Sequence, residues 1–519
     1  MRLQSHHSHQ TLHQIHLFFR NSNLPSPLRL DLITRRKEML NFDRKADMVS
    51  PDLPKKSPRV LNKHHISIPP PPPPVHELEL AAASESACSA YEYYLRLPEL
   101  SRLWSSKEFP DWKNECLIKP ALQGLETTFR FVSVVLSDPR PYANRREWKR
   151  RLESLARSQV EIIAMLCEDD AEDDETRGAA PIVDLTSSDA VLSRENSSVE
   201  VWKLSGDTTV VSRTSEASLL PRLGTWRKSE DVARKVLDSI ESEMHRCPYT
   251  LGLGEPNLTG KPSLDYDSIV RPTELHSLKK SPSERLNLQN YENQTLYTTL
   301  HVFESWICAS KSLLHRISER IDRKEFDKAR SDCWILEKTW RLLTEIQDLH
   351  LLMDPDDFLR LKNQLSIKAI SETELFCFRS KGLVEITKLS KSLKHTVPCI
   401  LGVEVDPKGG PRVQEAAMEL FRRKDSADKI HLLQALQAIE MSLKRFYYSY
   451  RQLLVVVMGS LEAKANPATV NADSGDLLAQ IFLEPTYFPS LDAAKTFLGE
   501  HWSHDHGRCR PGKGEMSQK

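Results

Sequence analysis

The chain has 519 residues, of which 72 are basic and 72 acidic, so its formal net charge at pH 7 is zero. This balance excludes a protein-wide positive field that would attract nucleic acid or an anionic membrane. No apolar run approaches the ~20 residues that cross a bilayer. The nine cysteines are scattered without CxxC pairs, which is typical of reduced thiols inside the cell. We therefore expect a cytoplasmic protein, with the nucleus as an alternative compartment, that binds neither nucleic acid nor membranes.

Residues 1–80 are predicted to be a disordered leader followed by a proline-rich linker. The first 38 residues are rich in arginine, histidine and serine and contain no acid before Asp31, which is the composition of an organellar transit peptide. An overextended gene start is the alternative, because Met39 and Met48 follow closely. The six prolines of residues 69–74 predict a stiff polyproline II segment that acts as a spacer.

Helical periodicity begins at Ser89. Apolar residues recur at steps of three and four along 117–136 and again along 145–167, with prolines between the two segments. This spacing places the apolar side chains on one face of each helix. We predict an N-terminal helical region over 81–168.

An acidic, disordered insertion is predicted over 169–222. Seven of the eight residues at 168–175 are acidic, and the following residues are rich in serine, threonine and aspartate. Such a stretch buries too little apolar surface to offset chain entropy. Within it, Ile182, Val183, Asp184 and Leu185 resemble a SUMO-interacting motif, in which aliphatic side chains beside acids add as a strand to a sheet edge. A chance apolar patch is the alternative.

A second helical region is predicted over 223–507, followed by a disordered tail at 508–519. Apolar seams lie along 300–321 and 336–346, and the short turn near Lys324 predicts an antiparallel helix pair. Further helices are expected at 355–366, 372–394, 412–423 and 427–463. The one strand candidate is 399–405. With no alternation of strands and helices, we predict an all-α multi-helix bundle whose two helical regions flank the acidic insertion.

No catalytic, cofactor-binding or metal-binding residue is predicted. Gly252, Gly254 and Gly260 do not have the GxGxxG spacing of a dinucleotide fingerprint, and no strand precedes them, so a structural loop is favoured. His501, His504, His506 and Cys509 cluster near the end of the chain. A structural zinc site, however, needs four ligands on a framework that fixes their geometry.

The segment 484–504 crowds Tyr487, Phe488, Phe497 and Trp502 close to the end of the chain. Aromatic side chains of this size contribute to stability when they are buried. Ser490 is a candidate N-cap, and Asp492 suits a first helical turn. We predict a closing helix that clamps the C-terminal bundle, with Phe497 beside its apolar face.

Several long strings in order resemble the plant HSPRO family of nematode-resistance-protein-like proteins. These strings are SAYEYYLRLPELSRLW (89–104), RCPYTLGLGEPNLTGKP (246–262), DLHLLMDPDDFLRLK (348–362), VEVDPKGGPR (403–412) and the segment 484–504. The resemblance implies no known enzymatic activity and a role in basal defence and stress signalling. It also implies a partner, the regulatory βγ-type subunit of the SNF-related energy-sensing kinase.

We therefore expect a non-enzymatic regulator of plant defence that acts as an adaptor for this kinase complex. Two other classes of function stay open. One is an enzyme or small-molecule sensor with a pocket between helices, which buried His or Glu side chains converging in a cleft would favour. The other is a nuclear scaffold that binds SUMO through residues 182–186.

Overall fold

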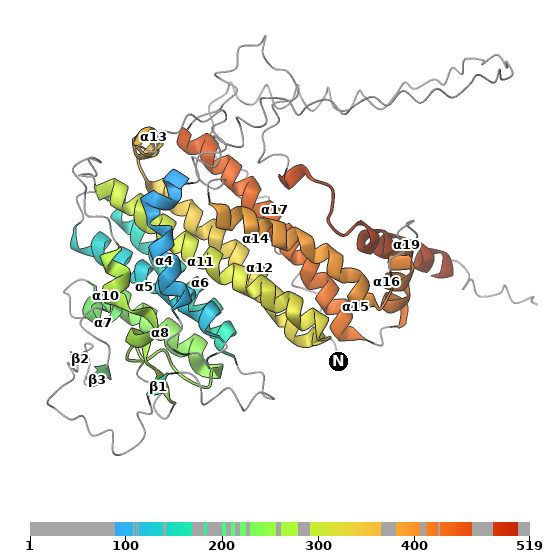
Figure 1. Ribbon diagram of the computed structural model, residues 1–519, viewed down its shortest axis with the longest axis horizontal. Coiled ribbons are helices and arrows are strands. Elements are labelled where there is room, and N and C mark those ends of the chain that lie inside the picture. The colour runs from blue at the N-terminus through green and yellow to red at the C-terminus, as the bar shows by residue number, and fades with distance from the viewer. Residues whose placement is uncertain are drawn as a thin grey trace, which may run out of the picture. The chain divides into compact units, whose positions relative to one another are not determined.

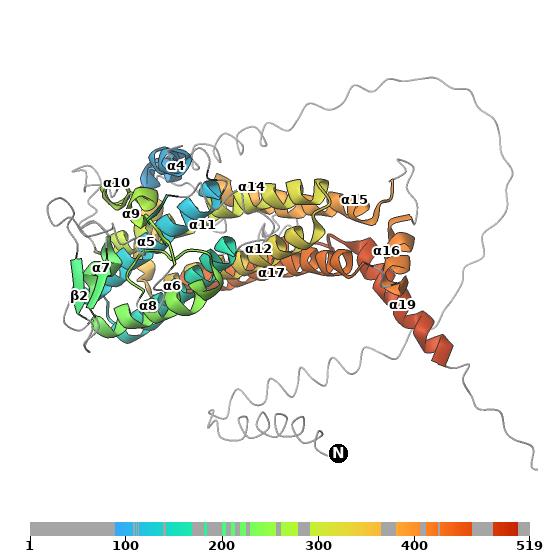
Figure 2. The same ribbon diagram turned by 90° about the horizontal axis from the view of Figure 1, so that it is seen from below.

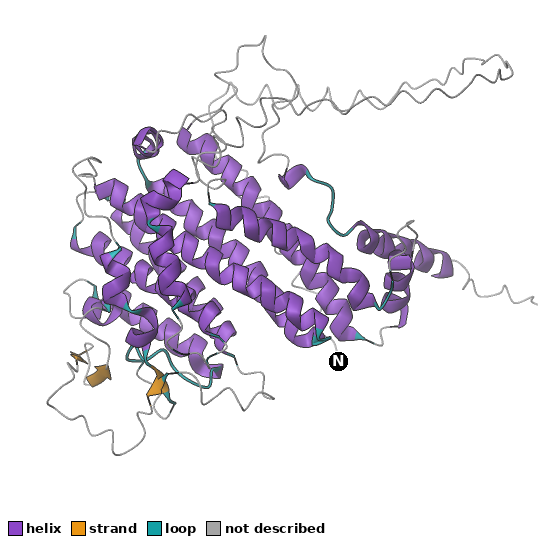
Figure 3. Cartoon of the chain, viewed as in Figure 1, coloured by secondary structure: helices purple, strands orange, loops and turns teal. Residues whose placement is uncertain are grey.

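Helices account for nearly all regular structure in the described part of the chain (Figures 1 and 3), and the prediction of an all-α fold is confirmed. The computed structural model describes residues 89–106, 109, 112, 114–138, 142–168, 181–183, 200–203, 209–212, 218–224, 229–255, 261–278, 291–364, 380–404, 412–423, 426–458 and 481–506. The predicted leader and linker at 1–80 and the tail at 508–519 lie outside these residues.

The N-terminal helices pack against the centre of the bundle. Residues 89–95 are helical and lead into α4 (Leu97–Ser105), α5 (Glu115–Ser137) and α6 (Arg145–Cys167). A Cβ on Gly124 of α5 would lie 3.0 Å from Trp306 Nε1, so glycine allows α5 to approach α11 closely. The Trp306 indole donates to Gln159 Oε1 at 2.9 Å, and Gln159 donates to Thr128 at 2.8 Å. These bonds join α5, α6 and α11 and satisfy polar groups that burial would otherwise leave unpaired.

Three long helices lie side by side: α11 (Tyr291–Asp322), α12 (Phe326–Asp348) and α17 (Ala427–Met458) (Figures 1 and 2). Lys324, with a positive φ of 63°, makes the short turn between α11 and α12. The predicted antiparallel pair is therefore confirmed. Trp340 of α12 packs edge-on against Phe446 of α17, with ring centroids 5.3 Å apart.

Shorter elements follow α6 and precede α11 in the chain. They are α7 (Leu219–Gly224), α8 (Glu230–Glu243), η2 (Met244–Arg246), β4 (Ser263–Leu264), α9 (Tyr266–Val270) and α10 (Pro272–Ser277). Helix α8 packs on α6 and α7, and α7 packs on α5. Leu220 and Leu223 of α7 are buried, so packed structure already begins within the last residues of the predicted insertion.

The remaining strands also fall within 169–222. Strand β1 (Ile182–Val183) pairs antiparallel with β4, and β2 (Glu200–Lys203) pairs antiparallel with β3 (Thr209–Ser212). The acidic run itself lies almost wholly outside the described residues. Among all residues that the structure describes, strand pairing is limited to these two two-stranded ladders and one isolated bridge between Thr250 and Ser263.

The strand predicted at 399–405 is wrong. The chain forms α14 (Lys381–Ser392), η5 (Leu393–Thr396) and α15 (Val397–Leu401), and Cys399 lies inside α15. Pro398 stands in the first turn of α15, where its missing N–H costs nothing. Gly402, with a φ of 69°, ends the helix. A short apolar run does not by itself distinguish a buried strand from a buried helical turn.

The C-terminal elements are η3 (Leu349–Leu352), α13 (Pro355–Gln364), α16 (Arg412–Arg423) and α19 (Pro489–His506). Helix α19 packs against α16. Leu491, Ala494 and Leu498 are buried, as the predicted closing helix requires, and Phe497 beside them is 48% exposed. Ser490 is not the N-cap, because the helix begins one residue earlier and Phe488 O accepts the first backbone bonds from Leu491 and Asp492. The Trp502 side chain lies outside the described ones.

The helices of both predicted regions contribute to one continuous apolar core. The fully buried aromatic side chains include Tyr91, Phe129, Trp306, Trp340 and Phe446, drawn from both regions. Among the described helices, none is long and apolar enough to cross a membrane.

Candidate functional site

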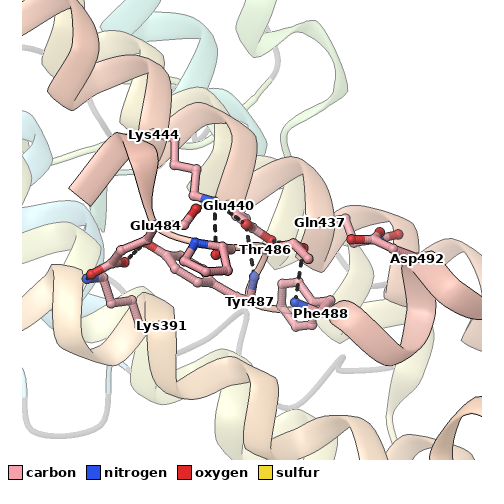
Figure 4. A network of polar contacts seen from close by, with 10 residues as sticks. Lys391, Gln437, Glu440, Lys444, Glu484, Thr486, Tyr487, Phe488 and Asp492 are labelled. Carbon is pink, nitrogen blue, oxygen red and sulfur yellow. Dashed lines mark hydrogen bonds and ion pairs between the residues drawn. The ribbon is translucent and has the colours of Figure 1, made fainter. Parts of the chain in front are cut away.

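The segment 484–488 is bound to α14 and α17 by a polar network (Figure 4). Lys391 of α14 contacts Glu484 Oε1 at 2.7 Å, and the Tyr487 hydroxyl donates to Glu484 Oε2 at 2.8 Å. Lys444 of α17 donates to the backbone oxygens of Glu484 and Pro485 at 2.9 and 3.2 Å. Side chains from two helices therefore fix both the backbone and the carboxylate of this short segment.

Tyr487 lies between these charges. Its backbone N–H donates to Glu440 Oε1 at 3.0 Å, and Lys444 Nζ and Lys391 Nζ lie 4.8 and 5.6 Å from its ring centroid. Such cation–π contacts stabilise most when the cation is partly desolvated. Burial and the hydrogen bond to Glu484 raise the pKa of the Tyr487 hydroxyl. Burial alone would raise the pKa of Glu484, but its bonds to Lys391 and Tyr487 and the nearby lysine charges lower it.

The network continues into the start of α19. Phe488 is buried and its N–H donates to Thr486 Oγ1 at 3.3 Å. Gln437 of α17 donates to Asp492 Oδ1 at 2.6 Å, and Lys495 binds Gln437. The segment thus holds α19 in place, which agrees with the predicted clamp. It contains no group that the surroundings prepare as a nucleophile or general base.

Two buried titratable groups lie one turn apart on α11. Burial lowers the pKa of His301 to about 4, and its Nε2 lies 2.8 Å from the backbone oxygen of Leu95. Burial raises the pKa of Glu304 to about 7, although hydrogen bonds from the hydroxyls of Ser380 and Tyr91 oppose the rise. The Tyr91 hydroxyl donates to Glu304 Oε1 at 2.8 Å. Both side chains tie helical residues 89–95 to α11, which is a structural use of a buried polar group.

Glu126 of α5 forms a second buried cluster. Its carboxylate accepts from Tyr266 at 3.0 Å and from the N–H of Leu219 at 3.0 Å, and it lies 3.1 Å from His276 Nε2. Burial raises the pKa of Tyr266, and the negative charge of Glu126 adds to the effect. The carboxylate therefore joins α7, α9 and α10 to α5.

The glycine-rich loop binds the chain's own carboxylate. Gly252 and Gly254 have positive φ values of 77° and 93°. The N–H groups of Leu251 and Leu253 each donate to Glu255 at 3.1 Å. A Cβ on Gly252 would come within 2.5 Å of Leu264 O, which explains the glycine. In a phosphate loop such backbone amides would bind a ligand, whereas here they bind the carboxylate of Glu255. This arrangement agrees with the predicted structural loop.

The structure describes part of the proposed SUMO-interacting segment. Ile182 and Val183 form β1, with Ile182 opposite Leu264 and Val183 opposite Ser263, whereas Asp184 and Leu185 lie outside the described residues. A bound SUMO strand would have to add at the other edge of β1. SUMO binding therefore stays a prediction. Equal pull-down of the full chain and of an Ile182→Ala/Val183→Ala variant by SUMO would contradict it.

Three of the histidines near the end of the chain belong to α19. His501, His504 and His506 are helical, but their side chains and Cys509 lie outside what the structure describes. Among the described residues, no group of three or more His, Cys, Asp or Glu side chains has a metal-binding arrangement.

Sequence reasoning missed the polar side chains that bind 484–488, since Lys391 and Lys444 lie 93 and 40 residues from Glu484. It also missed the exposed apolar side chains of α17, because they are interspersed with polar residues on the side of the helix opposite its longer apolar face. Their seven-residue spacing, at Met441, Tyr448 and Val455, is the signal that could have found them.

Together these features define an all-α protein whose buried carboxylates and histidines join helices, and whose C-terminal segment is clamped to the bundle. The chain belongs to the Hs1pro-1 family: residues 39–241 match the Hs1pro-1 N-terminus and residues 244–504 match the Hs1pro-1 protein C-terminus. It is 51% identical over 467 residues to nematode resistance protein-like HSPRO2 of Arabidopsis thaliana, and 50% identical over 466 residues to nematode resistance protein-like HSPRO1 of the same plant. Each alignment covers 90% of this chain and the whole of the relative.

Proposed function

We propose that this protein is a non-enzymatic regulator of plant basal defence and stress signalling. It acts as an interaction adaptor for an SNF-related energy-sensing kinase complex and binds the regulatory βγ-type subunit. The observation that carries the defence role is the identity of about half of all aligned residues with two proteins named as nematode resistance protein-like. Identity at this level over the full length of both relatives supports a shared role in defence.

The use of the buried titratable groups supports an adaptor more than an enzyme. Catalytic acids and bases have perturbed pKa values in a cleft that substrate reaches. Here His301 and Glu304 have perturbed pKa values, but each bonds to residues 91–95 and links packed helices. His350 also has a pKa that burial lowers to about 4, and its Nδ1 lies 2.7 Å from the backbone oxygen of Gln347, three residues earlier, so this bond is local to the end of α12.

Affinity purification of the tagged full-length chain from stressed plant tissue tests the proposal. We expect the regulatory βγ-type subunit to be enriched over a purification from untagged tissue, with the catalytic kinase subunit recovered alongside. Absence of every kinase subunit from the full-length purification would contradict the adaptor function. If plants that lack the protein are nevertheless impaired in defence, the protein would then have to act through another partner.

A further inference from the structure

The outward face of α17 carries apolar side chains at seven-residue intervals. Ala438, Met441, Arg445, Tyr448, Gln452 and Val455 follow one another at alternating steps of three and four, and we call these six residues the α17 seam. This spacing places them in a line along one face of the helix, as the a and d positions of a coiled coil do. The pattern extends over almost three heptads.

The seam is exposed, although the opposite face of α17 is already buried in the core. Met441, Tyr448 and Val455 are 51%, 50% and 41% exposed, and the adjacent Val456 is 69% exposed. A helix that faces solvent on one side usually carries polar residues there. Contiguous exposed apolar side chains mark interaction sites on soluble proteins. Helix α17 therefore has one apolar face buried in the bundle and a second, narrower apolar strip that is exposed.

Neighbouring elements border the seam on two sides. Phe482 packs edge-on against Tyr448 with ring centroids 5.4 Å apart, and the next residue, Leu483, is 73% exposed. On the side of α12, Glu337 accepts from Ser442 at 2.7 Å and holds Arg341, whose side chain is 53% exposed, at 2.6 Å. The seam thus has an apolar border at 482–483 and a cation at its α12 edge.

The charge of the seam specifies the chemistry of its occupant. Arg445 is exposed and forms no ion pair or hydrogen bond with any part of the chain that the structure describes. The seam contains no acidic residue. A second copy of this chain, in either orientation, would bring another arginine and no carboxylate from its own seam, and Glu337 at the border is already paired with Arg341. Burying Arg445 without a counter-charge is costly, so a partner with an acidic side chain fits better than a second copy.

We propose that the α17 seam binds an amphipathic α-helix of a partner protein. Apolar side chains of that helix pack against Met441, Tyr448 and Val455, and a carboxylate pairs with Arg445. This mode uses anchors at helical spacing in the manner of other helix-in-groove complexes. The proposal rests on the proposed adaptor function, for which it supplies the docking surface.

Two designed peptides test the chemistry directly. Each is a helix of about 21 residues with leucine at the a and d positions of three heptads. One carries glutamate at the position that faces Arg445 and the other carries lysine. We expect the full-length wild type to bind the glutamate peptide at least about tenfold more tightly, by fluorescence anisotropy, and Arg445→Glu to reverse this preference.

Matched variants separate the seam from general surface effects. Tyr448→Ser should weaken both peptides by about tenfold or more, since buried tyrosines are frequent interface anchors. Tyr93→Ser, at another exposed tyrosine, and Arg422→Glu, at an exposed arginine of α16, should leave binding unchanged. Absence of peptide binding by the wild type, or equal binding by Tyr448→Ser, would overturn the proposal. So would a wild-type dimer in sedimentation that Tyr448→Ser dissociates, because the occupant would then be a second copy.

The purified βγ-type kinase subunit distinguishes failure of the seam from failure of the adaptor function. A subunit that binds the wild type and the Tyr448→Ser variant equally would refute the seam and leave the adaptor function standing. A subunit that binds neither, while the glutamate peptide still binds the wild type, would refute the adaptor function and leave the seam as a helix-binding site. Binding to the wild type alone supports both.

Discussion

Replacing Glu304 with glutamine should change how the stability of the protein depends on pH. In the folded protein, burial raises the pKa of this carboxyl from 4.5 to about 7, against the bonds from Ser380 and Tyr91, and the charge of Glu92 adds to the rise. The folded state therefore holds a proton between these pH values that the unfolded chain has released. The free energy of unfolding of the wild type must fall as the pH rises through this window.

The magnitude follows from the two pKa values. The difference between about 7 and 4.5 is about 2.5 pH units, and each unit corresponds to about 1.4 kcal/mol. The contribution of Glu304 is thus fully present at and below about pH 4.5, and about 3 kcal/mol of it is lost by about pH 8. Glu304→Gln does not titrate. Its free energy of unfolding should rise relative to that of the wild type by about 3 kcal/mol over this range.

Urea denaturation followed by far-UV circular dichroism at a series of pH values measures this difference. His301 and His350, whose pKa values are lowered to about 4, contribute an opposite slope, but they are present in both proteins and cancel in the comparison. Glu319→Gln, at an exposed glutamate of the same helix, is the matched control and should run parallel to the wild type. A Glu304→Gln difference that stays constant with pH would refute the reasoning about this buried carboxyl.

Three further changes test the packing. Phe488→Ala should lower the free energy of unfolding by about 3–5 kcal/mol, because removal of its buried ring leaves a cavity. Phe497→Ala, at an exposed position, should lower it far less, and chemical denaturation measures both. Trp306→Phe removes the donor to Gln159 and should cost about 1–3 kcal/mol by the same measurement, and an unchanged stability would contradict the buried bond. Truncation after Leu483 removes α19 and its clamp and should leave the protein insoluble or rapidly cleaved in limited proteolysis. A compact truncated protein that loses only partner binding would instead make the removed segment an interface.

The sequence predicted the helices well because their apolar residues recur at the helical period. The helix expected at 412–423 has those bounds, and the one expected at 427–463 is described over 427–458. The strand expected at 399–405 failed, since five apolar or small residues in a row carry no period that separates a strand from a helical turn. Local spacing was therefore informative for long elements and uninformative for short ones.

The candidate site was harder to predict, because its parts come from distant positions. The aromatic segment at 484–488 was visible in the sequence, but its partners Lys391 and Lys444 were not, since charged residues on helices usually face solvent. The buried bond between Tyr91 and Glu304 spans 213 residues. Which polar side chains become buried depends on how the helices pack against one another. Residue spacing in a single sequence does not predict these contacts between distant positions.

Direct binding of the purified full-length protein to the purified regulatory βγ-type kinase subunit tests the central claim most directly. Isothermal titration calorimetry measures the interaction without any other plant protein. An adaptor should give a saturable binding curve with the wild type. If the α17 seam is its docking surface, Tyr448→Ser weakens this binding and Tyr93→Ser leaves it unchanged. Absence of measurable heat, together with no co-sedimentation of the two purified proteins, would contradict the adaptor function.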